Sequence, residues 1–275
     1  MSPAPAPTVG ATDTPAIAAW TADEIAEAER QCDGLLSGIA ADGDRLAPIR
    51  LGECGTPLPL RLKRIGSGAG VDVSPAATTN CALTARLYQW LETVAQPAAK
   101  RRLGSHIVKI RNVSSYMCRN RYNDPAAKIS EHAFANALDV AAFELADGRT
   151  IDVKTYWGAV VESAEAEAAA RAAAAAKTTE GDRKSPVAGQ LNLATRSLTR
   201  GISTARADTP PKAGTPDAGQ PAPTVPETAE LSFLKELHTG ACGVFTTVLG
   251  PHANRAHHDH FHLDLKQRSG RSYCE

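Results

Sequence analysis

The sequence has no net charge and no long apolar run, and each absence excludes a class of protein. Thirty Lys and Arg residues balance thirty Asp and Glu residues in a chain of 275, so no net field would attract nucleic acid or an anionic membrane. The sequence contains no run of about 18 apolar residues, which excludes a membrane-spanning helix. The N-terminus also lacks the basic and hydrophobic regions of a secretory signal, so either a signal has been removed or export is not encoded here. We expect no nucleic-acid partner and no transmembrane segment, and the sequence leaves the oligomeric state open.

Much of the chain has a composition that is unsuited to a packed core. Residues 1–20 and 178–228 are rich in Pro, Ala, Thr and Gly without an apolar period, which predicts disorder, and residues 160–177 are mostly Ala and Glu, which favours an isolated helix. We expect one domain built from residues 21–159 and 229–275, with a disordered N-terminal segment at 1–20. Residues 160–228 would form an insertion of one Ala-rich helix and a disordered stretch. Residues 178–228 should be dispensable for folding, because they offer little apolar surface to offset chain ordering.

The cysteines indicate the redox compartment. No CxxC pair or closely spaced Cys/His set suggests a structural zinc ribbon, and an even number of cysteines favours disulfides in an oxidising compartment. Buried free thiols in a cytosolic protein are the alternative. Spacing alone does not choose among the possible pairings. We favour the pairs Cys32–Cys54, Cys81–Cys118 and Cys242–Cys274.

Local patterns predict several helices and strands. Thr21 and Glu24 fit a capping box that begins a helix, and Pro75 suits the first turn of a second helix that ends or kinks at Pro97. The segment 107–113 is rich in β-branched residues, as a strand would be. Asp147-Gly148 would form the turn of a hairpin between 137–143 and 150–153. A short helix is expected at 231–237.

Two of the expected strands carry polar residues that alternate with apolar ones. Side chains on a strand point to opposite faces in turn. In 257–265 this places Phe261, Leu263 and Leu265 in the core, and His260, His262 and Asp264 on the other face. In 137–143, Asp139 lies opposite Leu138 and Val140. If the two strands are neighbours, Asp139 and His262 converge.

A third ligand, His132, would complete a catalytic zinc site. Such sites take three protein ligands from His, Asp, Glu or Cys and leave one position for water. His132, Asp139 and His262 supply that number, and His260 lies on the same face as His262. The alternative for any one of them is an ordinary hydrogen-bonded or solvated residue.

The motifs around these residues are similar to those of known families. The run Ser130–Asp139 resembles the SxHxxGxAxD signature of the D-Ala-D-Ala carboxypeptidase, lysostaphin and hedgehog-like zinc peptidases, with Ala135 in place of the glycine, and 260–262 resembles their closing HxH. More narrowly, the sequence resembles the bacterial extensin-like C-terminal domain family over roughly 30–157 and 229–275. The motifs that carry this resemblance are SYMCR at 115–119, SEHAFANALDVAAF at 130–143, VLGP at 248–251 and HDHFHLDL at 258–265. The Ala-rich insertion falls outside the family pattern.

The resemblance implies a zinc peptidase of the bacterial cell wall. His132, Asp139 and His262 would bind Zn²⁺, and His260 would act in catalysis beside the water that the metal binds. The substrates would be peptidoglycan stem peptides with D-amino acids, cut by an endopeptidase or a carboxypeptidase in the periplasm or another extracytoplasmic space. Ser130 would orient His132. Three residues would contact the substrate, namely Tyr116, Arg119 and Arg121, with an Arg fork suited to a carboxylate and Arg119 also counted as catalytic.

These expectations combine into an α+β fold. A small antiparallel sheet would carry the zinc site, N-terminal helices would cover its other face, and the disordered insertion would interrupt the domain. Two other functions remain open. The first is a zinc-containing but inactive wall-binding module. The second is a secreted structural protein, as the word extensin suggests, although the chain lacks the Pro-rich repeats of a plant wall extensin.

Overall fold

The computed structural model describes residues 19–157 and 227–275, which belong to one unit. The expected N-terminal disorder, and the helix and disorder expected at 160–226, therefore lie outside the described residues. The helices are α1 (Ala22–Leu36), α2 (Cys81–Trp90), α3 (Gln96–Leu103), α4 (Val153–Trp157) and α6 (Ala229–Ala241). Strands β1 to β6 are Ala41–Arg45, Ile49–Leu51, Cys54–Thr56, Leu60–Ile65, Val71–Thr79 and Ile107–Ser114, and strands β7 to β11 are Ala137–Leu145, Thr150–Asp152, Thr247–Leu249, Phe261–Asp264 and Tyr273–Cys274.

The main sheet has nine strands and mixed direction. Its order is β1-β4-β5-β6-β7-β10-β9-β11, and β8 pairs with the second half of β7. The pairs β5–β6 and β9–β11 are parallel, whereas the others are antiparallel. The expectation of a small antiparallel sheet is therefore wrong, although the class is α+β. The reason is that α2 and α3 carry the chain from β5 back to the start of β6, so β6 runs parallel to β5.

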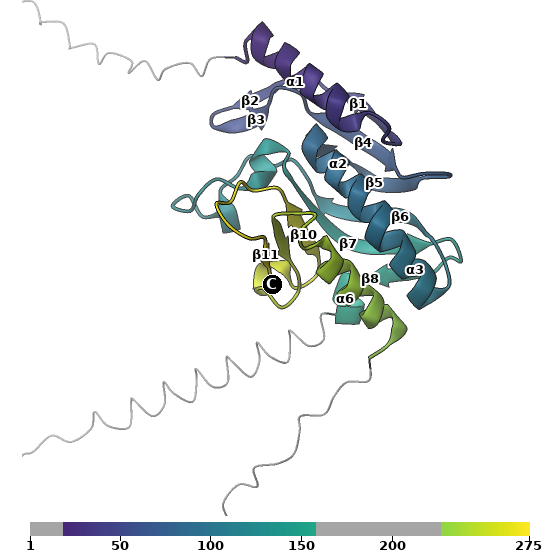
Figure 1. Ribbon diagram of the computed structural model, residues 1–275. Helices are drawn as coiled ribbons and strands as arrows, with labels where there is room; N and C mark the ends of the chain where they lie inside the picture. Colours follow the sequence, from purple (N-terminus) through teal and green to yellow (C-terminus); the bar gives the residue numbers. More distant parts are fainter. Residues whose placement is uncertain (1–18, 158–226) are drawn as a thin grey trace, which may run out of the picture. The chain divides into compact units, whose positions relative to one another are not determined.

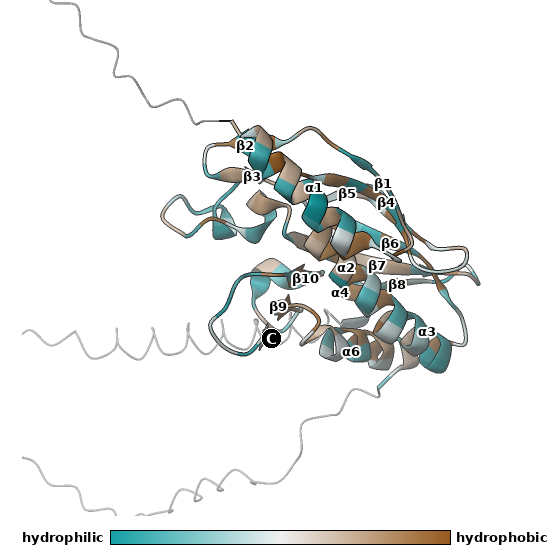
Figure 2. Cartoon of the chain, turned by 45° about the horizontal axis from the view of Figure 1, so that its top comes forward, coloured by the Kyte–Doolittle hydropathy of each residue, from teal (hydrophilic) through white to brown (hydrophobic). Residues whose placement is uncertain are grey.

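The core lies between this sheet and three helices. Helices α2, α3 and α6 cover one face of the sheet (Figure 1). The cover thus includes a helix from the C-terminal part of the chain as well as the N-terminal ones. Hydrophilic and hydrophobic residues alternate along α1 and α3 (Figure 2), as expected for helices with one face on a core. The fully buried aromatic residues are Trp90, Phe143, Phe233, Phe245 and Phe261. Among the described residues, no helix is both long and apolar enough to cross a membrane.

The two parts of the interrupted domain meet inside the sheet. Strand β10, from the C-terminal part, pairs with β7, which precedes the insertion. The hairpin between β7 and β8 and the strand β6 lie where the sequence predicts them, within a few residues. The helix expected at 231–237 is α6, and it is longer at both ends.

The first helix begins as predicted, whereas the second does not. The side chain of Thr21 accepts from the Glu24 N–H and Glu24 reaches back to the Thr21 N–H, which is a capping box. The second helix begins at Cys81, because the Asn80 side chain accepts from the Leu83 N–H at 2.8 Å and caps it. Pro75 lies within β5 instead. A π-helical turn at Leu91–Ala95 precedes Pro97, which lacks an N–H to continue the regular hydrogen bonding.

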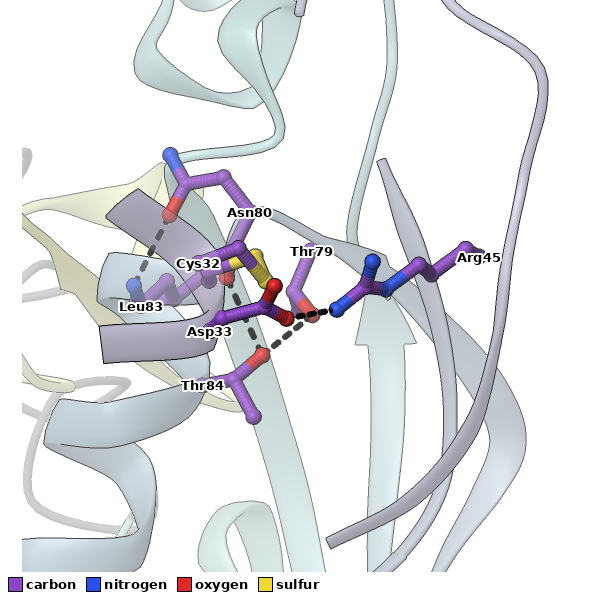
Figure 3. Close-up of a disulfide and its surroundings, with 8 residues drawn as sticks. Cys32, Asp33, Arg45, Thr79, Asn80, Leu83 and Thr84 are labelled. Atoms are coloured by element: carbon purple, nitrogen blue, oxygen red, sulfur yellow. Dashed lines mark hydrogen bonds and ion pairs between the residues drawn. A yellow bond between two sulfur atoms is a disulfide. The ribbon is translucent and has the colours of Figure 1, made fainter. Parts of the chain in front are cut away.

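All six cysteines are paired, but two of the three expected pairings are wrong. The disulfides are Cys32–Cys81, Cys54–Cys118 and Cys242–Cys274. The first joins α1 to the start of α2, beside the Asn80 cap (Figure 3). Cys32 and Cys81 share a small buried cluster with Leu58 and Leu60. The tertiary fold brings α1 against α2, so Cys32 meets a partner further along the chain than the nearest cysteine.

Candidate metal centre

Three buried side chains meet at the junction of β7 and β10. Asp139 on β7 stands directly opposite His262 on β10 in the antiparallel register, and Ser114 of β6 is its neighbour on the other side. His132 lies on the short 3-10 helix Glu131–Phe134 that precedes β7. Leu138 and Leu263 point into the core, as the alternation predicts. Asp139 and His262 therefore face the opposite side, which is hollowed into a pocket.

A left-handed residue links His132 to the strand. Ala135 has φ 53° and ψ 29°, and its N–H donates to the His132 carbonyl at 3.2 Å. L-residues adopt this conformation at a cost, whereas glycine does so freely. The position therefore needs the turn that glycine provides in the broader signature. Alanine makes the same turn, so the site keeps its form with some backbone strain.

The donor atoms of the three candidate ligands lie close enough together to hold one metal ion. The Asp139 carboxylate lies 3.2 Å from His132 Nε2 and 2.8 Å from His262 Nδ1, and the two nitrogens are 3.2 Å apart. Zinc holds such ligands at about 2.0–2.1 Å, which places tetrahedral donor atoms roughly 3.3 Å apart. The set His132, Asp139 and His262 could therefore hold a metal ion.

The far sides of both imidazole rings are fixed by hydrogen bonds. His132 Nδ1–H donates to the Ser115 carbonyl at 2.5 Å, and His262 Nε2–H donates to the Asp264 carboxylate at 3.0 Å. In these neutral tautomers, His132 Nε2 and His262 Nδ1 present lone pairs towards the Asp139 oxygens. In that state a cation between the three electron-pair donors, either a metal ion or a proton, would remove their mutual repulsion. Partners of this kind are typical of metal-binding histidines, because they fix the ring and its tautomer.

Protons take the place of a cation when no metal is bound. Burial alone would raise the pKa of Asp139, but hydrogen bonds from His132 and His262 outweigh it and hold that pKa far below its usual range. Burial likewise lowers the pKa of His262, but Asp139 and Asp264 raise it to about 9. The metal-free site is thus held together by the His262 imidazolium and two carboxylates.

His260 lies at the edge of this centre, next to a carboxylate. Its Nε2 is 3.7 Å from Asp139 Oδ1, and its Nδ1–H donates to Asp259 Oδ1 at 2.8 Å. The His257 ring lies tilted against the His260 ring and edge-on to the His262 ring, with ring centres 5.3 and 5.5 Å away, and burial lowers the pKa of His257 to about 4. The strand begins at Phe261, so the alternation does not extend to Asp259. Asp259 therefore precedes the strand, and its carboxylate lies beside the His260 ring.

Of the other site residues that the sequence predicts, some line the pocket and one does not. Arg119 and Arg121 line the pocket, together with His132, Asp139, His260 and His262. Tyr116 is not among the lining residues, and its buried hydroxyl has no hydrogen-bond partner among the described residues. Ser130 accepts from the His132 backbone N–H at 3.4 Å, so it caps the helical turn while Ser115 holds the ring.

Sequence reasoning assigned no role to several residues of the site. Ser115 acts through its carbonyl group, which any residue type would supply, so its identity carries no signal. Asp264 was correctly predicted to share a face with His262, but no role was assigned to it. Arg268 and Tyr273 line the pocket from the C-terminal tail, where no motif marks them. Their contribution depends on β11 pairing with β9, a contact that composition and periodicity do not reveal.

Comparison with known proteins gives one match. The family model described as extensin-like protein C-terminus matches residues 30–180 and 221–275. No curated protein and no solved structure matches the sequence. The matched ranges include all the candidate ligands, His260 and both pocket arginines of the 115–130 segment.

Proposed function

The chain belongs to the extensin-like protein C-terminus family, and from its candidate metal centre we propose that it is a zinc-dependent peptidoglycan peptidase. It would hydrolyse stem-peptide bonds that involve D-amino acids, as an endopeptidase or a carboxypeptidase. We further propose that it is related to the D-Ala-D-Ala carboxypeptidase, lysostaphin and hedgehog-like zinc peptidases. Three disulfides favour an extracytoplasmic location, where peptidoglycan is found.

The observation that carries this proposal is a three-ligand site with a further histidine beside it. Structural zinc sites are closed by four protein ligands, whereas catalytic sites have three and leave room for water and substrate. Here two histidines and one aspartate converge in the lining of one pocket. His260 stands 3.7 Å from the aspartate without belonging to the ligand set. This arrangement supports hydrolysis over a purely structural role for the metal.

The residues divide the chemistry between them. Zinc, once bound to His132, Asp139 and His262, would supply a Lewis acid that activates water and polarises a peptide carbonyl. His260, oriented by Asp259 through Nδ1–H, can take up a proton at Nε2, and once protonated there it can donate a hydrogen bond to the developing oxyanion. Arg119 and Arg121 can hold a carboxylate of the substrate from the wall of the same pocket.

The test compares metal content with peptide release in four variants and the parent. His132→Ala, Asp139→Ala and His262→Ala each remove a ligand, so zinc content and activity should fall together. His260→Ala should retain zinc and fold, while turnover drops by about 10²–10³, as on loss of one oxyanion-stabilising donor. Zinc stoichiometry would be measured beside mass analysis of fragments released from intact peptidoglycan.

Two results would contradict the proposal in different ways. Zinc-loaded parent protein that releases no fragment from any stem-peptide cross-link would favour the wall-binding module instead. Full activity in His260→Ala would leave a peptidase but remove the role given to His260.

A further inference from the structure

Basic side chains gather at the metal pocket from two separate segments. Arg119 and Arg121 come from the segment that precedes the first ligand, and Arg268 comes from the tail after β10. None of the three forms an ion pair with another described residue. Lys266 lies outside the pocket lining but near these arginines: burial lowers its pKa, and the charges of Arg121 and Arg268 lower it further.

The Arg268 side chain is held in place by its neighbours. Its Nε and Nη2 both donate to Oγ1 of Thr247, at 3.3 and 2.8 Å. Its guanidinium also lies over the Tyr273 ring, 5.2 Å from the ring centre. Thr247 is buried on β9, and Tyr273 belongs to β11, which pairs with β9 and ends at the disulfide-bonded Cys274. A long side chain that is fixed in this way loses little further entropy when it binds a ligand.

The carboxylates of the pocket are already engaged elsewhere. Asp139 and Asp264 accept from His262, and Glu131 accepts from Asn136 Nδ2 at 2.9 Å. Glu131 and Asp264 oppose the charge on Lys266 only in part. Cations that crowd together without a counter-ion repel one another, and a bound metal would add two more positive charges. An anion at this place would relieve that repulsion.

We propose that Arg268, together with Arg121, forms a binding site for a free carboxylate of the stem peptide, so that the pocket selects peptides that are acidic next to the bond that is cut. This inference rests on the proposed peptidase function and gives it a substrate class. A planar guanidinium suits a carboxylate, because two parallel N–H groups can bind its two oxygens. Arg121 and Arg268 reach the pocket from different segments, so the site exists only in the folded chain.

The experiment uses the zinc-loaded full chain and two synthetic cross-linked peptides. They are identical except that the residue beside the scissile bond carries a carboxylate in one and a carboxamide in the other. The parent should prefer the carboxylate peptide by about 10- to 100-fold in kcat/KM, mainly through KM, as for a hydrogen bond to a charged group. Arg268→Gln should lose most of this preference by raising KM for the carboxylate peptide alone. Arg271→Gln, which removes one charge from the same tail outside the pocket lining, should keep the preference.

Failure of the carboxylate site and failure of the proposed function would give different results. Equal cleavage of both peptides by the parent, or an unchanged preference in Arg268→Gln, would overturn the carboxylate site and leave the peptidase intact. If the parent cleaves neither peptide, the proposed function is wrong. Equilibrium binding of fluorescent forms of both peptides to the parent then decides the inference, and equal affinities would overturn it.

Discussion

His262 and Asp264, on the same face of β10, are joined by a hydrogen bond in which Nε2–H donates to Oδ2 at 3.0 Å. The other oxygen of Asp264 accepts from the Lys266 backbone N–H at 2.9 Å. The carboxylate is thus fixed at both oxygens, and it turns the imidazole so that Nδ1 faces Asp139. Asp264, which lies outside the candidate ligand set, therefore sets the direction of one candidate ligand.

The first prediction concerns this carboxylate. Asp264→Asn keeps the side-chain shape but removes the charge that favours the Nε2–H tautomer of His262. Zinc affinity should fall by about 10- to 100-fold, as is typical when such a partner is lost, and the fold should be retained. Competition with a chromogenic chelator measures the zinc affinity. Glu131→Gln is the matched control, because Glu131 lines the same pocket without contacting a ligand side chain. Equal affinities in Asp264→Asn and the parent would contradict the role given to Asp264.

The second prediction is the pH dependence of stability in the metal-free protein. The pKa of His262 is raised to about 9, so its contribution is present below the unfolded value of about 6.5 and is lost as pH rises towards 9. The loss should be on the order of 3 kcal/mol. His257, whose pKa is lowered to about 4 by burial, acts in the opposite direction and costs stability as pH falls below about 6.5. Stability should therefore be greatest near pH 6.5.

Urea unfolding of chelator-treated protein between pH 4 and 9, in steps of about one unit, measures this profile. The matched variant is His262→Gln, which should lose the decline above about pH 6.5 but keep the decline below it. With zinc bound, stability should instead rise with pH above about 6.5, because the metal and the proton compete for the same nitrogen of His262. A metal-free parent that becomes more stable from pH 7 to 9 would show that the ion pair with Asp139 is absent.

Local sequence patterns predict β7 and β10, the strands that carry candidate ligands, because such a pattern depends on residues only a few positions apart. The alternation in β7 and β10 depends only on strand geometry, and it places Asp139, His262 and Asp264 correctly. The Thr21 capping box is local in the same sense. The start of the second helix was predicted from Pro75 alone, whereas the structure begins it after Asn80, whose side chain caps it.

What the sequence does not predict depends on contacts between distant segments. The parallel pairing of β5 with β6 and the disulfide between Cys54 and Cys118 both require the tertiary arrangement. The same holds for Arg268, which reaches the pocket because β11 lies beside β9. The alternation drawn over 257–265 fails at its start for a different reason, because the strand begins only at Phe261.

The third prediction concerns Ala135. This residue is fully buried with a positive φ, a conformation that costs an L-residue about 1–2 kcal/mol. Ala135→Gly should relieve this strain, and the greater freedom of glycine in the unfolded chain offsets about 0.4–1 kcal/mol of the gain. Thermal stability should therefore rise slightly. Ala135→Val should cost more than about 2 kcal/mol, because a branched side chain fits neither the conformation nor the space.

Ala141→Gly serves as the control for Ala135, since it lies in the middle of β7 without a positive φ. Glycine there should destabilise by about 0.5–1 kcal/mol. If both glycine variants lose stability equally, Ala135 is not strained.

The fourth prediction concerns the disulfides. Replacing Cys54 and Cys118 by serine should cost about 2–4 kcal/mol and should loosen the segment that carries Arg119 and Arg121, so KM for a stem peptide should rise. Replacing Cys32 and Cys81 by serine should cost a similar amount without changing KM, because that bond joins α1 to α2 away from the pocket. Peptide mapping without reduction should recover both pairs, and a peptide joined through Cys32 and Cys54 would refute the arrangement.

The last prediction tests whether Asp259 acts through His260. The carboxylate accepts from His260 Nδ1–H at 2.8 Å, which turns Nε2 towards the ligand set. Asp259→Asn removes the charge, and because an amide can also present its N–H₂ to the ring, the tautomer is no longer fixed. Turnover should fall by at least about tenfold, while zinc content and melting temperature should stay at the parent's values, since Asp259 contacts no ligand side chain.

A double-mutant cycle separates this role from a general effect on the pocket. In the His260→Ala background, the orienting task no longer exists, so adding Asp259→Asn should change turnover little further. Asp259→Glu, which keeps the charge on a longer side chain, should recover part of the loss in the parent background only. An equal drop in both backgrounds would mean that Asp259 acts independently of His260, for example on the substrate itself.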